Sequence, residues 1–129
     1  MTKCLVLYGT KYGSTREVAL VIADVLKADI ADVANQPDIG SYDVVVLGSP
    51  VYAGDYLDSV VQFIKANEGA FRGRKVGAFI TAAADMEWDP GLTGEEDELL
   101  FTQQDYADGL AKITGGEVLA AKGFGGRLL

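Results

Sequence analysis

Leu5-Val6-Leu7-Tyr8-Gly9-Thr10-Lys11-Tyr12-Gly13-Ser14-Thr15 is the stretch that decides the fold, and its character changes at Gly9. The aliphatic run before Gly9 shows no polar alternation, which is typical of a strand buried on both faces of a sheet. The apolar residues after Thr15 recur at the spacing of an amphipathic helix: Val18, Val21, Ile22 and Val25. The stretch therefore predicts a strand, a short hydroxyl-rich loop and a helix in direct succession.

This loop has the chemistry of a phosphate site. The first N–H groups of a helix lack intrahelical partners and lie at the positive end of its dipole, where they can donate to an anion. Thr10, Ser14 and Thr15 add hydroxyl donors, and Gly13 allows close approach or a positive φ. A polar turn before a capped helix is the alternative. Neither a nucleoside-triphosphate loop nor a G-x-G-x-x-G fingerprint is present.

Composition limits the class of protein. A chain of 129 residues suits one domain, residues 1–129, and 49% hydrophobic with 23% charged residues is typical of a globular protein. No apolar run approaches the roughly 18 residues of a membrane helix. The chain opens on its first strand without a signal peptide, and the single Cys4 suits a core position, so we expect a cytoplasmic protein.

Charge and residue counts also exclude several functions. The chain has no histidine and one cysteine, which argues against a His-based catalytic triad and a structural zinc site. A net charge of −8 argues against binding to nucleic acid or to an anionic membrane surface. It suits either docking to a basic partner or simple solubility.

Strands and helices alternate through the rest of the chain. Further strands are expected at residues 30–33, 43–49, 75–81 and 118–121, and helices from Leu57 toward Phe71 and from a capping box at residues 93–96 through Ile113. Gly115-Gly116 ends the last helix, and residues 82–92 form a long loop. Right-handed crossovers then predict an α/β fold, a doubly wound, five-stranded parallel sheet of order 2-1-3-4-5. The loops at residues 10–15, 49–56 and 81–88 should meet at one crevice.

Two of these loops carry a family resemblance. Thr10-Lys11-Tyr12-Gly13-Ser14-Thr15 resembles the FMN-phosphate loop of flavodoxins, T-x-[ST]-G-x-T. Tyr12 departs from that pattern, as in flavodoxin-like domains that include the menaquinone-dependent protoporphyrinogen oxidase family. Gly48-Ser49-Pro50-Val51-Tyr52-Ala53-Gly54 is similar to the second flavin loop of these proteins. The resemblance covers nearly the whole chain and implies a flavodoxin-like fold with FMN as cofactor.

The resemblance also implies a set of FMN-binding residues. Tyr52 is the expected ring contact, Gly54 allows a turn at the flavin edge, and the small residues at 82–84 allow the main chain to approach the pyrimidine edge. Met86 or Trp88 is expected to cover a ring face, and the choice between them stays open. No catalytic residue or metal ligand is predicted. The full predicted set is Thr10, Lys11, Tyr12, Gly13, Ser14, Thr15, Ser49, Pro50, Val51, Tyr52, Ala53, Gly54, Thr81, Ala82, Ala83, Asp85 and Met86.

The implied function is electron transfer between a reductant and an acceptor, either a redox partner protein or a small molecule. One alternative is a protoporphyrinogen oxidase-like flavoenzyme that uses a quinone, and another is a cofactor-free interaction module on the same fold. A signalling receiver domain is disfavoured, because Gly9-Thr10 and Gly48-Ser49 stand where it needs acidic residues.

A flavodoxin-like fold normally closes with a helix after its fifth strand, but this sequence ends at Arg127-Leu128-Leu129. Without that helix, part of an apolar sheet face would be bare. We expect a C-terminal truncation; the alternative is a neighbouring chain, such as a second copy in a homo-oligomer, that covers the face.

Overall fold

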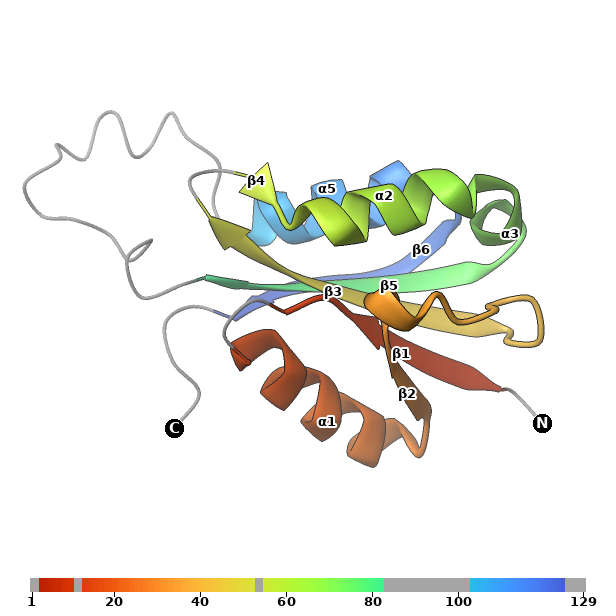
Figure 1. Ribbon diagram of the computed structural model, residues 1–129, viewed down its shortest axis with the longest axis horizontal. Helices are drawn as coiled ribbons and strands as arrows, with labels where there is room; N and C mark the ends of the chain where they lie inside the picture. The colour runs from red at the N-terminus through yellow and green to blue at the C-terminus, as the bar shows by residue number, and fades with distance from the viewer. Residues whose placement is uncertain (1–2, 11–12, 53–54, 83–102, 125–129) are drawn as a thin grey trace, which may run out of the picture.

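The computed structural model describes residues 3–10, 13–52, 55–82 and 103–124. Its centre is one sheet with the strand order β2-β1-β3-β5-β6, and all neighbours in this order are parallel (Figure 1). These strands are β1 (Cys4–Tyr8), β2 (Asp29–Asp32), β3 (Val44–Tyr52), β5 (Lys75–Ala82) and β6 (Glu117–Phe124). The predicted order 2-1-3-4-5 of the parallel strands is therefore confirmed.

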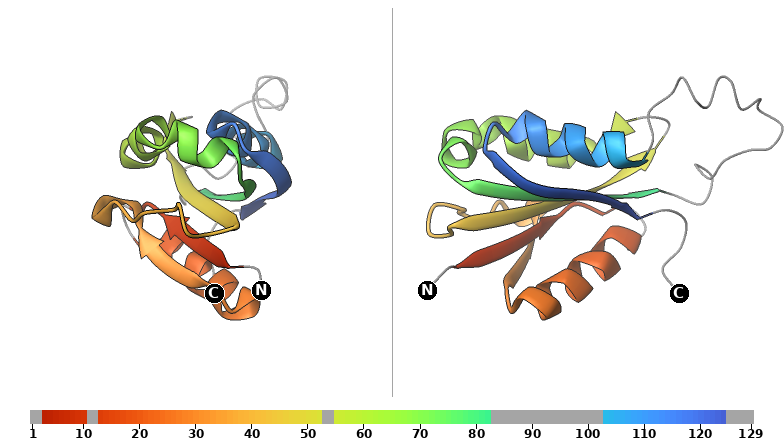
Figure 2. Two further views of the ribbon diagram at one scale, coloured as in Figure 1. Left: turned by 90° about the vertical axis from the view of Figure 1, so that its right-hand side faces the viewer. Right: turned by 180° about the vertical axis from the view of Figure 1, so that it is seen from behind.

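Helices cover the sheet on both faces. Helix α1 (Ser14–Leu26) lies on one face, and α2 (Asp58–Ala66), α3 (Glu68–Arg72) and α5 (Gln103–Thr114) lie on the other (Figures 1 and 2). Successive residues of β1 alternate between the two resulting cores: Leu5 and Leu7 pack on the α2 side, and Val6 and Tyr8 on the α1 side. Burial of both faces explains why this strand is a continuous hydrophobic run.

Strand β3 is longer than the predicted strand at residues 43–49. It continues through Tyr52, because Pro50 and Val51 pair with Thr81 and Ala82 of β5. Pairing between β1 and β3 ends at Gly48. Beyond that point the short strand β4 (Asp55–Tyr56) pairs antiparallel with β3, so the segment predicted as a loop is partly sheet. Pro50 has no backbone N–H to donate to a ladder, which makes proline uncommon in the interior of a sheet.

Other elements also differ from the prediction, and β6 extends beyond residues 118–121 to Glu117–Phe124. The helix expected from Leu57 toward Phe71 is two helices, because Asn67 leaves the helical conformation at φ −121° and ψ 23° and donates from Nδ2 to the carbonyl of Phe63 at 2.9 Å. The turn after β2 is a short 3-10 helix, η1 (Val33–Asn35). The predicted loop after Ala82 and the capping box at residues 93–96 lie outside the described residues, and α5 ends before Gly115 as predicted.

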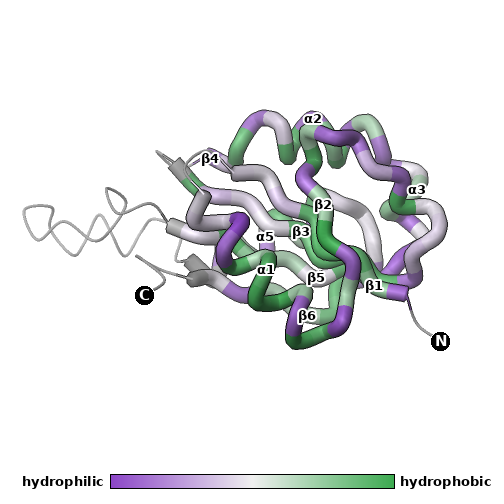
Figure 3. Tube along the Cα trace, turned by 60° about the horizontal axis from the view of Figure 1, so that its bottom comes forward, coloured by the Kyte–Doolittle hydropathy of each residue, from purple (hydrophilic) through white to green (hydrophobic). Residues whose placement is uncertain are grey.

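The α1 side of the sheet is only partly covered by described helices. Beside α1, over β5 and β6, two open apolar grooves have volumes of about 420 and 270 Å³. Leu26, Val46, Gly77 and Ala120 line both of them. Figure 3 views the molecule from this side, with hydrophobic residues along α1. No helix among the described residues is long and apolar enough to cross a membrane.

Candidate functional site

The candidate site lies at the carboxyl ends of β1, β3 and β5, which meet at one edge of the sheet (Figure 1). The β1–α1 loop, the β3–β4 segment and the end of β5 leave the sheet there. Ligand sites of open parallel sheets lie at this edge, next to the point where the strand order reverses. The predicted convergence of the three segments is therefore confirmed for their described residues.

The β1–α1 loop is closed by a hydrogen bond across it. The backbone N–H of Gly13 donates to the Thr10 hydroxyl oxygen at 2.8 Å. Gly13 is the N-cap residue of α1 and has φ 96° and ψ −15°, a left-handed conformation that favours glycine. A Cβ at this position would meet nothing within 4 Å, so conformation and not space requires glycine.

The first turn of α1 offers free donors. The earliest hydrogen bond of the helix runs from the Glu17 N–H to the Gly13 carbonyl at 3.1 Å. The N–H groups of Ser14, Thr15 and Arg16 precede it, and no acceptor for them lies among the described residues. Among the described residues these three amides have no partner, and unpaired amides at the positive end of a helix dipole can donate to an anion.

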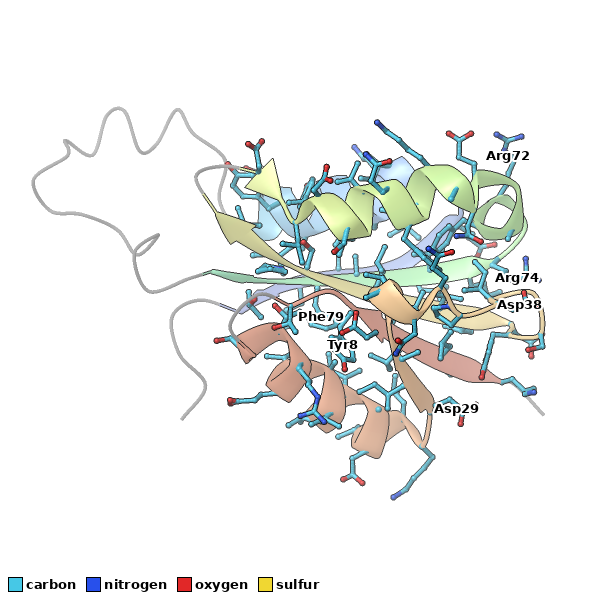
Figure 4. All side chains as sticks on the ribbon, viewed as in Figure 1. Tyr8, Asp29, Asp38, Arg72, Arg74 and Phe79 are labelled. Carbon is cyan, nitrogen blue, oxygen red and sulfur yellow. The ribbon has the colours of Figure 1, made fainter. Side chains whose placement is uncertain are left out.

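Thr15 ties this turn to the end of β5. Its Oγ1 lies 2.8 Å from the Oγ1 of Thr81, and the two side chains are only 1% and 3% exposed. Beside this pair, Phe79 packs on the α1 side of the sheet together with Tyr8 (Figure 4). The Phe79 ring fills the space over Gly48, where a Cβ would lie 2.0 Å from it. The Phe79 ring therefore packs directly against the backbone of β3 at Gly48.

The β3–β4 segment is held by Ser49, a fully buried residue. The Ser49 hydroxyl donates to the Pro50 carbonyl at 2.8 Å and accepts from the Leu57 N–H at 3.0 Å. Val51 is also fully buried and packs in the core on the α2 side. The side chains of Ser49 and Val51 thus contact protein.

The structure places part of the predicted site set and not the rest. Together at this edge lie Thr10, Gly13, Ser14, Thr15, Ser49, Pro50, Val51 and Thr81. Outside the described residues lie Lys11, Tyr12, Ala53, Gly54, Ala83, Asp85 and Met86, as does Trp88. Tyr52 and Ala82 end β3 and β5, and their side chains are not described. That each of these residues contacts FMN stays a prediction.

Two glycines of the site were not predicted as site residues. The Gly9 N–H donates to the Gly48 carbonyl at 3.1 Å, which joins the ends of β1 and β3. A Cβ on Gly9 would lie 2.5 Å from Val60 of α2, so Gly9 allows this helix to approach the loop. The available signal was a glycine followed by a hydroxyl residue at the end of each strand, Gly9-Thr10 and Gly48-Ser49.

The described residues hold no cluster of three or more His, Cys, Asp or Glu side chains that could bind a metal ion. Cys4 begins β1, at the opposite end of the strand from the site. Burial raises the pKa of its thiol above the ordinary value, which disfavours the nucleophilic thiolate. The polar groups that the described residues place at this edge are backbone amides and hydroxyls.

The fold is that of a doubly wound α/β protein with a hydroxyl-containing loop between its first strand and first helix. Residues 5–128 match the flavodoxin domain family, and the chain belongs to that family. A curated relative, protoporphyrinogen IX dehydrogenase [quinone] of Escherichia coli (strain K12), is 37% identical over 70 residues. The match covers 49% of this chain and 39% of the relative, so the chain matches less than half of that protein's length.

Solved structures share the fold. The flavodoxin of Fusobacterium nucleatum bound to flavin mononucleotide has a TM-score of 0.65 and 17% identity, covering 92% of this chain and 70% of that one. A flavoprotein of Lactobacillus acidophilus NCFM in complex with FMN has a TM-score of 0.64 and 15% identity, covering 95% and 93%. At these identities the likeness extends to the fold.

Proposed function

We propose that this protein binds FMN at the carboxyl edge of its sheet and carries electrons between a reductant and an acceptor. The observation that carries the proposal is the first turn of α1. There Gly13 holds a left-handed conformation, and the amides of Ser14, Thr15 and Arg16 have no acceptor among the described residues. Family membership supports the same cofactor, as do the FMN complexes of two proteins with this fold.

The residues of the loop fit a phosphate group. The protein carries a net charge of −8, so an anion must be held mainly by local dipoles. The amides of the first turn and the hydroxyl of Ser14 supply neutral donors, and the exposed Arg16 supplies a cation on the same turn. The open space around Gly13 leaves room for the group to approach.

FMN and the protein chain have different roles at this site. FMN, when bound, supplies the redox chemistry, since its ring accepts and donates electrons singly or in pairs. The chain would position the cofactor: the first turn of α1 would hold the phosphate, and the β3–β4 segment and the end of β5 would lie beside the ring. No described side chain has the surroundings of a catalytic acid, base or nucleophile, so we assign this chain a binding and positioning role.

A second candidate function is protoporphyrinogen oxidation with a quinone as acceptor. It is favoured by the 70-residue match to protoporphyrinogen IX dehydrogenase [quinone]. The two candidates share the FMN site and differ in the partner that exchanges electrons with it. Assays of the FMN-loaded protein with protoporphyrinogen IX and a quinone, and separately with a reductase and a redox-protein acceptor, distinguish them.

Flavin titration tests FMN binding directly. We expect the protein to quench the fluorescence of added FMN and to bind FMN more tightly than riboflavin, which lacks the phosphate. Gly13→Ala should weaken FMN binding, because a left-handed conformation costs a non-glycine residue about 1–2 kcal/mol.

The matched control is Gly115→Ala. Gly115 also has a positive φ, 79°, and open space around its Cβ position, but it follows α5. Gly115→Ala should lower stability by a similar amount and leave FMN affinity unchanged. A wild-type protein that ignores added FMN, or equal effects of the two variants on FMN affinity, would contradict the proposed function.

A further inference from the structure

The bond between Thr15 and Thr81 joins two buried hydroxyls that lie 66 residues apart in the sequence. Thr15 is the second residue of α1, and Thr81 is near the carboxyl end of β5. Their oxygens are 2.8 Å apart, and either hydroxyl can be the donor. Thr15 belongs to the turn whose first amides have no acceptor among the described residues, so the direction of this hydrogen bond bears on the proposed anion site.

Each hydroxyl has one proton to donate and two lone pairs to accept with. If Thr15 donates to Thr81, its oxygen has only lone pairs left for other partners, and lone pairs repel an anion. If Thr81 donates to Thr15, the proton of Thr15 is free for the anion. A phosphate at the turn therefore favours the second arrangement, in which the two hydrogen bonds point the same way and strengthen each other.

We propose that Thr81 is a positioning residue for phosphate recognition: it donates to Thr15 and thereby directs the Thr15 proton to the phosphate of the bound flavin. This inference rests on the proposed function. It assigns Thr81 a role different from the direct flavin contact that the family resemblance implies, because Thr81 acts through Thr15. With both side chains at most 3% exposed, water cannot readily replace the missing donor.

In this role the Thr81 hydroxyl contributes to binding of the phosphate group and not to binding of the flavin ring. Removal of its hydroxyl should weaken FMN binding and leave riboflavin binding unchanged. The test measures dissociation constants for both ligands by fluorescence quenching, in the wild type and in Thr81→Val, Thr81→Ser, Thr15→Val and the Thr15→Val/Thr81→Val double variant. Valine keeps the shape of threonine without the hydroxyl, and serine keeps the hydroxyl.

We expect Thr81→Val to raise the FMN dissociation constant about 5- to 10-fold, which corresponds to the loss of one hydrogen bond between two neutral hydroxyls. Thr81→Ser should restore wild-type affinity for FMN. In the Thr15→Val background, Thr81→Val should add no further loss, because Thr81 has no Thr15 hydroxyl left to direct. If Thr81→Val does not fold, Thr81→Cys, whose S–H is a weak donor, takes its place.

Thr114 provides a matched control for the loss of a buried hydroxyl. It is 2% exposed, and its Oγ1 donates to the Ala111 carbonyl at 2.7 Å and accepts from the Gly116 N–H at 3.2 Å. Thr114→Val, at the end of α5, should lower stability and leave both flavin affinities unchanged.

If the wild-type protein binds FMN, three results would overturn the proposed role of Thr81. They are an unchanged FMN affinity of Thr81→Val, equal losses for FMN and riboflavin, or an additive loss in the Thr15→Val background. A wild-type protein that does not bind FMN overturns the proposed function itself, and with it this inference.

Discussion

At the scale of single residues, the close approach of Gly48 and Phe79 shows how tightly the sheet packs beneath the site. The two residues are register partners on β3 and β5, and a Cβ on Gly48 would overlap the Phe79 ring. Phe79 is 1% exposed and packs against the α1 side, so its ring has little room to move. The packing beneath the site therefore requires glycine at position 48.

We expect Gly48→Ala to lower the free energy of unfolding by about 1–3 kcal/mol, the usual cost of overpacking a core. Urea unfolding followed by circular dichroism measures it. Gly69→Ala is the control: Gly69 lies in α3 with nothing within 4 Å of its Cβ position, so alanine should stabilise the helix by about 0.5–1 kcal/mol. Equal effects at the two glycines would show that the Phe79 contact is unimportant.

Tyr56 carries a pH-dependent contribution to stability. Its hydroxyl donates to the Tyr106 carbonyl at 2.7 Å, which links β4 to α5. Burial, with a smaller contribution from the charge of Tyr106, raises the pKa of Tyr56 above its ordinary value of 10.0. The folded state thus favours the neutral phenol. Its contribution is complete below the unfolded-state pKa and is lost as pH rises through the higher folded-state pKa.

Tyr56→Phe should therefore cost about 0.5–1.5 kcal/mol at neutral pH, where the hydrogen bond is lost. Above the unfolded-state pKa of Tyr56, the variant should lose stability less steeply than the wild type. Thermal unfolding across the alkaline range measures both effects. Tyr42→Phe is the comparison, since the hydrogen bond from Tyr42 to Asp29 also raises the pKa of Tyr42 but lies at an exposed position. Parallel alkaline profiles for wild type and Tyr56→Phe would exclude this role.

At the scale of elements, Ser49 connects two segments of the site, the end of β3 and the start of α2. Its hydroxyl bonds the Pro50 carbonyl in β3 and the N–H of Leu57, the N-cap residue of α2. A single buried side chain thus sets how α2 begins relative to the end of β3. The alternation of strands and helices predicted both elements, but not this connection, because Ser49 and Leu57 become neighbours only when β4 pairs with β3.

We expect Ser49→Ala to lower the free energy of unfolding by about 1–3 kcal/mol, because the Leu57 N–H loses its partner. Amide exchange should become faster at Leu57 and in β4 than in β1, since the loss is local. Ser59→Ala, at an exposed position of α2, is the control and should change neither property. Unchanged exchange at Leu57 in Ser49→Ala would mean that other contacts hold the segment.

At the scale of the whole molecule, the α1 side of the sheet exposes an apolar surface. Val25 of α1 is 71% exposed and Leu119 of β6 is 53% exposed, beside the 420 Å³ groove that Leu119 lines. The described helices leave this part of β5 and β6 open. The expectation of a bare face is met for the described residues, whereas the reason for it stays a prediction.

An apolar surface of this kind should bind the dye ANS under native conditions. We expect enhanced ANS fluorescence with the wild type and a weaker signal with Leu119→Lys. The unfolding free energy should change by no more than about 0.5 kcal/mol, as for other surface substitutions. Ile113→Lys, at a 46% exposed position of α5 on the other face, should leave the dye signal unchanged. Equal signals from the two variants would place the dye elsewhere.

The sequence alone determined the five parallel strands, their order and the alternation of strands with helices, because burial on both faces and helical spacing are local patterns. It also determined the hydroxyl loop at Thr10–Thr15, because these six residues contain both the glycine and the start of the helix. Only the tertiary structure decided the extension of β3, the break at Asn67 and the pairs Gly9–Gly48, Gly48–Phe79 and Thr15–Thr81. These features depend on contacts between segments far apart in the chain, and no local pattern encodes which residues the fold brings together.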